Sequence, residues 1–185
     1  MAWGKKKNVI GLDIGSSSIK LVELREGKNG FRLQNLAVSS LAPEAIVDGA
    51  LMDSVTIIDT IKDLVNSVTK TREVVTSVSG HSVIVKKITL PFMTETELGE
   101  SIQWEAERHI PFDINDVNID FQILGSGSDN PEMMDVILVA AKKDIINDYR
   151  SVIMEAGLNP VVVDIDAFAL ENMLGINYDI ERDEV

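Results

Sequence analysis

Two charged residues lie on either side of a short turn made only of glycine and serine near the start of the chain. Asp13 ends one apolar segment, Lys20 lies in the next, and the turn between them runs Gly15-Ser16-Ser17-Ser18. Small residues in such a turn allow backbone N–H groups to approach a phosphate closely. Asp13 could hold a water on the Mg²⁺ that accompanies the phosphate, and Lys20 could supply a positive charge. This pattern predicts half of a nucleotide-binding site.

The same turn has a plainer interpretation. Aspartate, glycine and serine are common in ordinary hairpin turns, because they form local hydrogen bonds and tolerate unusual dihedral angles. Two features favour the phosphate-binding interpretation: the first strand starts close to the N-terminus, and Lys20 lies seven positions after Asp13. This spacing resembles the first phosphate loop of actin and its relatives. The rest of the chain has to decide between the two interpretations.

The composition is that of a globular protein with an acidic surface. The chain has 185 residues, of which 45% are hydrophobic and 25% charged, and its formal net charge is −13. This charge argues against a nucleic-acid partner, which clustered basic residues would bind, because the one basic run is Lys5-Lys6-Lys7. The apolar segment after that run stops at Asp13, too early for a signal peptide or a membrane span. With no cysteine in the chain, these features predict a cytoplasmic protein.

The first part of the chain predicts a meander of strands followed by a helix and another strand. The strands are expected at 9–14, 19–25, 31–39 and 74–79. Between the third and fourth, after a linker with Pro43 and Gly49, apolar residues from Ile57 to Val68 recur at three- and four-residue spacing. That spacing predicts a helix with one buried stripe. The strand after the helix should pair in parallel with an earlier one through a right-handed crossover.

The second part predicts a group of strands and helices of a different texture. In order, these are a strand at 82–90, a helix that begins with the capping box Thr94 to Glu97 and ends before Pro111, strands at 117–124 and 135–141, and a helix at 144–156. Residues 125–131 are polar and predict a mobile loop. Gly157 suits the end of the last helix, and the apolar run 161–163 suits a strand buried on both faces. A short helix at 167–174 and a frayed acidic tail at 179–185 follow.

The order of these elements and four short motifs resemble the actin-like ATPases of the FtsA branch, and within it the PilM family of type IV pilus assembly proteins. The motifs are the hairpin Gly11-Leu12-Asp13-Ile14-Gly15-Ser16-Ser17-Ser18-Ile19-Lys20, then Leu90-Pro91-Phe92, Glu107-Arg108-His109-Ile110-Pro111-Phe112-Asp113, and Asp164-Ile165-Asp166-Ala167-Phe168-Ala169-Leu170. The resemblance extends over nearly the whole chain. It implies a mixed α/β fold with an actin-like, ribonuclease H-like core lobe.

The resemblance also implies an organisation and a function. The core lobe is expected from residues 1–82 and 158–185, with an inserted α+β lobe at 83–157 and no second actin-like lobe in these residues. The implied cofactors are ATP and Mg, on an incomplete site formed by Asp13, Gly15, Ser16, Ser17, Ser18 and Lys20. The implied role is a cytoplasmic scaffold that docks the N-terminal cytoplasmic peptide of PilN and communicates with the pilus motor apparatus. Its association with the inner membrane is then indirect, through these partners.

Two other functional classes share parts of the pattern. A sugar or acetate kinase of the same superfamily has the phosphate hairpin, but it also needs a placed catalytic carboxylate, which the inserted lobe does not offer. A division protein of the FtsA type has the inserted lobe and anchors through a C-terminal amphipathic helix, whose position lies beyond this chain. No base is placed opposite a γ-phosphate, so no catalytic residue and no hydrolysis are predicted.

The remaining polar and apolar candidates each have two interpretations. Ile110, Pro111 and Phe112 form either a groove for an extended peptide or a hydrophobic plug between lobes. Asp164 and Asp166 could touch Mg²⁺ through water, but a strand end and a cap for the helix from Ala167 are the simpler roles. His81 and His109 are expected at a lobe junction and at a helix end, and no transition-metal site is predicted from two distant histidines.

Overall fold

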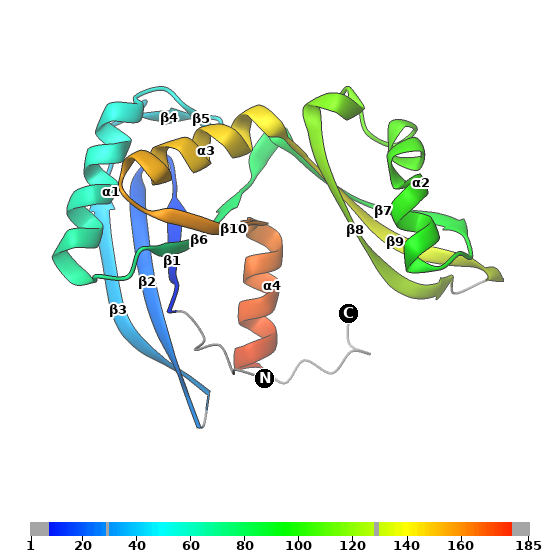
Figure 1. Ribbon diagram of the computed structural model, residues 1–185, viewed down its shortest axis with the longest axis horizontal. Coiled ribbons are helices and arrows are strands. Elements are labelled where there is room, and N and C mark those ends of the chain that lie inside the picture. The colour runs from blue at the N-terminus through cyan, green and yellow to red at the C-terminus, as the bar shows by residue number, and fades with distance from the viewer. Residues whose placement is uncertain (1–7, 29, 128–129, 179–185) are drawn as a thin grey trace, which may run out of the picture. The chain divides into compact units, whose positions relative to one another are not determined.

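The computed structural model describes residues 8–28, 30–127 and 130–178, and the chain divides into two compact units. Unit 1 consists of Met1–Gly80 and Asn147–Val185, and unit 2 of His81–Ile146 (Figure 1). The expected inserted lobe ended at 157, whereas the second division falls inside helix α3 (Lys143–Glu155). The buried residues of α3, which are Tyr149, Val152 and Ile153, all lie on the unit 1 side of this division. The basic run at 5–7 and the acidic tail at 179–185 lie outside the described residues.

Unit 1 is built on a five-stranded mixed sheet. Its order is β10-β6-β1-β2-β3, with β1 (Ile10–Ile14), β2 (Ser18–Gly27), β3 (Gly30–Ser40), β6 (Glu73–Val78) and β10 (Asn159–Ile165). β1, β2 and β3 pair antiparallel in succession, which confirms the predicted meander. β6 runs parallel to both β1 and β10, which confirms the parallel neighbour expected after the helix.

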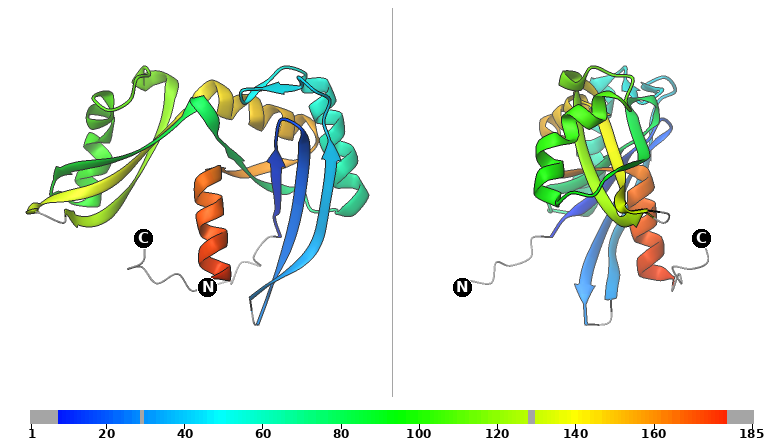
Figure 2. Two further views of the ribbon diagram at one scale, coloured as in Figure 1. Left: turned by 180° about the vertical axis from the view of Figure 1, so that it is seen from behind. Right: turned by 90° about the vertical axis from the view of Figure 1, so that its right-hand side faces the viewer.

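Helix α1 (Ser54–Val68) packs against the β2–β3 part of this sheet (Figure 2). It begins earlier than the apolar spacing indicated because Asp53 caps it: Oδ1 of Asp53 accepts the N–H of Thr56 at 3.1 Å. Ile57 and Ile61 of the helix and Ile19 and Leu21 of β2 are fully buried. The linker before α1 also holds a short antiparallel pair that the sequence did not indicate, β4 (Ile46–Val47) and β5 (Ala50–Leu51).

Unit 2 combines a three-stranded antiparallel sheet with one long helix. The sheet order is β7-β9-β8, with β7 (Val83–Pro91), β8 (Val117–Gly127) and β9 (Asn130–Lys142), and the helix is α2 (Glu95–Glu107). The short 3₁₀ turn η1 (Gly80–Ser82) lies at the start of this unit, and a second 3₁₀ turn, η2 (Ile114–Asp116), lies within it. The predicted capping box is confirmed, because Thr94 N–H donates to Glu97 Oε2 at 2.8 Å and Glu97 N–H donates to Thr94 Oγ1 at 3.3 Å.

The prediction of a polar loop at 125–131 is wrong for most of that range. β8 continues to Gly127 and β9 begins at Asn130, and these two residues pair with each other. Register shifts near Gly125 and Gly127 absorb the extra residues in the long hairpin. Cross-strand pairing therefore overrides the local preference of Gly, Ser and Asn for a turn. Residues 128–129 lie outside the described residues.

The β10 strand and the helix after it differ from expectation in two details. Val161 and Val162 are 43% and 48% exposed, so the strand is not buried on both faces, because β10 lies at the edge of its sheet. Helix α4 (Asp166–Asn177) has Ile165 at its N-cap, without a side-chain cap, so Asp166 does not cap it as predicted. Asp166 lies in the first turn, where a carboxylate still interacts favourably with the helix dipole. Of the described helices, none has the length and apolar character needed to cross a membrane.

Gly157 ends α3 in the predicted left-handed conformation, with φ +81°. The N–H groups of Gly157 and Leu158 donate to the carbonyls of Met154 and Ile153 at 2.9 and 3.2 Å, which is a Schellman motif. We expect Gly157→Ala to lower the free energy of unfolding by about 1 kcal/mol, because a Cβ disfavours this φ although no atom lies within 4 Å of it. Urea unfolding measures the change.

The matched control for this substitution is Gly175→Ala in α4, also a glycine with no atom within 4 Å of an added Cβ. Gly175 lies inside the helix, where alanine is preferred by about 0.5–1 kcal/mol. Equal effects of the two substitutions on the unfolding free energy would contradict the assigned role of Gly157.

Candidate nucleotide and partner sites

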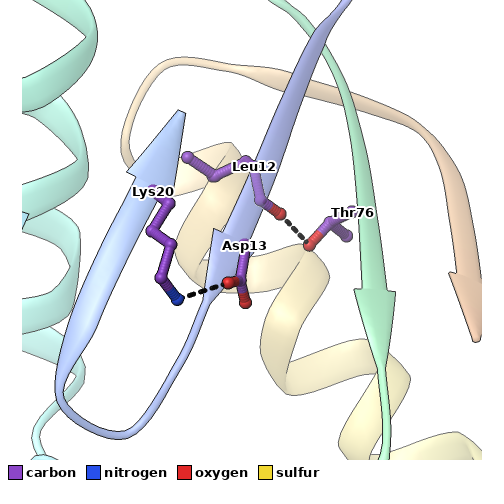
Figure 3. A network of polar contacts seen from close by, with 4 residues as sticks. All are labelled: Leu12, Asp13, Lys20 and Thr76. Atoms are coloured by element: carbon purple, nitrogen blue, oxygen red, sulfur yellow. Dashed lines mark hydrogen bonds and ion pairs between the residues drawn. The ribbon is translucent and has the colours of Figure 1, made fainter. Parts of the chain in front are cut away.

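The β1–β2 hairpin places the two predicted charges directly opposite each other. Asp13 pairs with Lys20 in the strand register, and Gly15 N–H donates to the Ser18 carbonyl at 3.1 Å to close the turn. Nζ of Lys20 lies 2.6 Å from Oδ2 of Asp13, and the two side chains are 48% and 55% exposed (Figure 3). Both groups are thus accessible at the mouth of the turn. In this structure the Lys20 ammonium and the Asp13 carboxylate neutralise each other. A bound magnesium–phosphate group would instead engage each of them separately.

Gly15 is required by the close approach of its neighbours. A Cβ at this position would lie 3.3 Å from the Ser18 carbonyl oxygen, 3.7 Å from Nζ of Lys20 and 3.8 Å from Oδ1 of Asp13. A side chain would therefore be tight against the turn carbonyl and in ordinary contact with the two charged groups. Ser16 and Ser17 are exposed at the tip of the turn, and the Ser17 carbonyl accepts the N–H of Leu41 at 3.0 Å. That bond ties the tip to the segment after β3.

A hollow of about 360 Å³ lies beside the hairpin, within unit 1. It is lined by Gly11, Leu12, Asp13, Lys20, Val22, Val75, Thr76, Ser77, Asp164 and Ala169. This volume is at the small end of the range for ligand pockets, about 300–1,000 Å³. Oγ1 of the buried Thr76 donates to the Leu12 carbonyl at 2.8 Å and joins β6 to β1 under the hollow (Figure 3). The lining thus combines apolar side chains with the charged groups of Asp13, Lys20 and Asp164.

Asp164 comes to the same hollow as Asp13, and Asp166 does not line it. Oδ1 of Asp164 accepts the N–H of Ile165 at 2.8 Å, so the carboxylate is held toward the end of β10. Carboxylates are suitable partners for Mg²⁺, which keeps several of its waters. Asp13 and Asp164 fit such a hydrated ion. Among the described residues, no three His, Cys, Asp or Glu side chains gather to hold a metal directly.

Tyr149 lies near the charges of Asp13 and Asp166, and sequence reasoning did not single it out. It lies in the buried stripe of α3 and is 6% exposed. Burial raises the pKa of the Tyr149 hydroxyl, and the negative charges of Asp166 and Asp13 raise this pKa further. The neutral form of Tyr149 is therefore favoured over a wider pH range than that of a free tyrosine.

The predicted partner residues separate into a core residue and two accessible ones. Ile110 is 6% exposed and belongs to the core of unit 2, and Phe112 is partly buried against that core. Pro111 is exposed. A hollow of about 520 Å³ is lined by Pro111, Phe112, Asp113, Asp116, Lys142, Lys143 and Asp144. The structure thus brings Pro111 and Phe112 to a hollow and places Ile110 in the core of unit 2.

The polar groups around this hollow are ordered by local contacts. Nζ of Lys142 lies 4.7 Å from the centroid of the Phe112 ring, within range of a cation–π interaction. Lys143 donates to the Asn115 carbonyl at 2.7 Å, and Asp113 accepts the backbone N–H of Asn115 at 2.9 Å. Phe112 therefore has one ring face against a cation and part of its surface open to the hollow.

The mixed sheet with a glycine–serine hairpin, interrupted by an inserted α+β unit, confirms the expected α/β class of protein. The family described as type IV pilus assembly protein PilM matches residues 11–181. A solved structure described as the PilM–PilN type IV pilus biogenesis complex is 34% identical, with a TM-score of 0.79. The alignment covers 92% of this chain and 52% of that one, so this chain spans about half the length of the solved protein. The chain belongs to the PilM family of type IV pilus assembly proteins.

A second solved structure shares the fold at lower identity. It is the cytoplasmic domain of EpsL, an inner-membrane component of the type II secretion system of Vibrio cholerae. It is 15% identical, with a TM-score of 0.55, and the alignment covers 85% of this chain and 57% of that one. This likeness concerns the fold alone. With the family shown, neither the kinase nor the division-protein interpretation is retained.

Proposed function

We propose that this protein is a cytoplasmic scaffold of the type IV pilus assembly machine that docks the N-terminal cytoplasmic peptide of PilN. The observation that carries the proposal is the match to the PilM–PilN complex over 92% of the chain. Its contact with the motor apparatus and its indirect association with the inner membrane form part of the same proposal.

The peptide site that we propose is the hollow beside Pro111 and Phe112. A proline and an aromatic ring beside a hollow of about 520 Å³ offer apolar contacts to an extended peptide. The lysines and aspartates around it offer polar contacts at the rim. Ile110 supports this surface from the core, because it is buried directly before Pro111 in the chain.

Calorimetric titration with the N-terminal PilN peptide, with and without Mg-ATP, tests the proposal. We expect saturable binding that is the same in both conditions, because the Phe112 hollow lies within unit 2 and the hairpin lies within unit 1. Absence of binding to a chain that circular dichroism shows to be folded would contradict the proposed docking function.

We propose in addition that the hairpin and its hollow are part of an ATP site. Lys20 and the turn N–H groups of residues 16–18 would contact phosphate, since the Gly15 N–H already donates to the Ser18 carbonyl, and Asp13 would hold the hydrated Mg²⁺. When bound, the Mg²⁺ supplies charge neutralisation of the phosphates. Asp164 is a further candidate for a water-mediated contact, because it lines the same hollow as Asp13.

We expect this chain to bind Mg-ATP with a dissociation constant of about 1 mM or weaker. Three or four charge-assisted hydrogen bonds contribute about 1.5–3 kcal/mol each, while association costs about 4–15 kcal/mol. Titration of the chain with Mg-ATP, followed by NMR chemical shifts, measures the affinity, and Lys20→Ala is the control that removes the phosphate contact. Micromolar binding, or binding unaffected by Lys20→Ala, would be inconsistent with this account.

A further inference from the structure

Trp104 lies on the face of α2 that points away from the core of unit 2. The buried residues of the helix are Leu98, Ile102 and Ala106, which form one stripe. With about 3.6 residues per turn, position 104 falls on the opposite side of the helix from Ile102. The Trp104 side chain is 73% exposed. Packing in unit 2 therefore does not account for a tryptophan at this position.

The helix around Trp104 is strongly acidic. Glu100 lies four residues before it and Glu107 three residues after it, which places both on the same face. Within its bounds α2 has five glutamates and neither lysine nor arginine. Two of these glutamates are engaged, since Glu97 closes the capping box and Glu105 lies 3.8 Å from Arg108. The side chains of Glu100 and Glu107 have no hydrogen bond or ion pair with another residue that the structure describes.

We propose that Trp104, Glu100 and Glu107 form a docking surface for an arginine-containing basic segment of a protein partner. Tryptophan is the aromatic side chain that binds cations best over its ring, and arginine is the cation found most often in such contacts. The two glutamates can each accept paired hydrogen bonds from a guanidinium group. An acidic partner is disfavoured by this face and by the net charge of −13.

This surface is separate from the hollow proposed for the PilN peptide. No residue of α2 lines the hollow beside Phe112. A solvated helix face needs only charged residues, and an indole there adds a large apolar area without a partner in its own unit. Tryptophan and arginine also dominate the energetics of protein interfaces. The combination on α2 therefore fits a protein partner with complementary charge.

The emission of Trp104 provides a direct test in the full chain. The sequence has two tryptophans, so a Trp3→Phe background leaves Trp104 as the one reporter. The probe is a synthetic arginine–serine repeat peptide, with a glutamate–serine repeat as the acidic counterpart. We expect saturable quenching or a blue shift of Trp104 emission with the basic peptide alone. No change in emission, despite binding detected by calorimetry, would overturn the proposal.

Substitutions then separate this surface from general attraction to an acidic protein. We expect Trp104→Ala, and separately Glu100→Gln with Glu107→Gln, to weaken binding of the basic peptide about tenfold or more in calorimetry. The matched control is Val55→Ala with Asp59→Asn and Asp63→Asn on α1, where Val55 is 70% exposed. An equal loss in the control set would mean non-specific charge attraction and would overturn the proposal. In a variant that circular dichroism shows to be folded, Phe112→Ser should leave this binding unchanged, whatever its effect on the PilN peptide.

Discussion

We expect Phe112→Ser to weaken binding of the PilN peptide about thirtyfold or more. An aromatic side chain at the centre of a peptide site typically contributes about 2 kcal/mol or more when it is removed. Phe112 lines the hollow of about 520 Å³ and holds Lys142 against its ring at 4.7 Å. Serine removes both the apolar contact and the cation–π interaction. Calorimetric titration of the variant with the peptide measures the loss.

Phe112 is also packed partly against the core of unit 2, so its folding has to be separated from its binding. Circular dichroism checks that Phe112→Ser is folded, and Phe112→Leu provides a second variant that keeps the apolar volume. We expect Phe112→Leu to bind the peptide with an intermediate affinity, because it retains the contact and loses the ring face. Unchanged affinity in both folded variants would place the peptide elsewhere on the chain.

Ile110→Ala has the second large expected effect, on stability instead of on recognition. Ile110 is 6% exposed and lies in the core cluster of unit 2 with Leu98, Ile102 and Val117. Removing a buried isoleucine side chain in this way costs about 2–5 kcal/mol of unfolding free energy. Urea unfolding followed by circular dichroism measures the loss.

A matched substitution at an exposed position of the same unit is Val85→Ala in β7, since Val85 is 46% exposed. We expect this control to change the unfolding free energy by less than about 0.5 kcal/mol, and to leave peptide affinity unchanged. If Ile110→Ala kept full stability and lost peptide binding, Ile110 would be a contact residue and our division of the triplet would be wrong.

Features set by neighbours along the chain were predictable with little error. The capping box at Thr94 and the left-handed Gly157 depend on residues a few positions away, and both are present. The hairpin is local as well, because a short turn forces Asp13 opposite Lys20 once two strands are assigned. The resemblance to PilM rests on the same short motifs, and the family match over residues 11–181 confirms it.

Features set by pairing between distant segments were less predictable. The turn chemistry at 125–131 indicated a loop, but long-range strand pairing carries β8 and β9 through most of it. The apolar run at 161–163 indicated a fully buried strand, but burial depends on strand order, which puts β10 at an edge. Asp166 was predicted to cap the helix that follows it, but helix α4 already begins at Asp166.

The sequence by itself determined the hairpin that sets Asp13 opposite Lys20, the order of the main helices and strands, and the family, because residue type and short spacing carry that information. The tertiary structure alone decided that Asp164 reaches the hollow beside Asp13 and Lys20. It also decided that Ile110 is buried while Trp104 is exposed. These outcomes depend on which distant strands and helices pack together, and packing is a property of the whole fold rather than of any short segment.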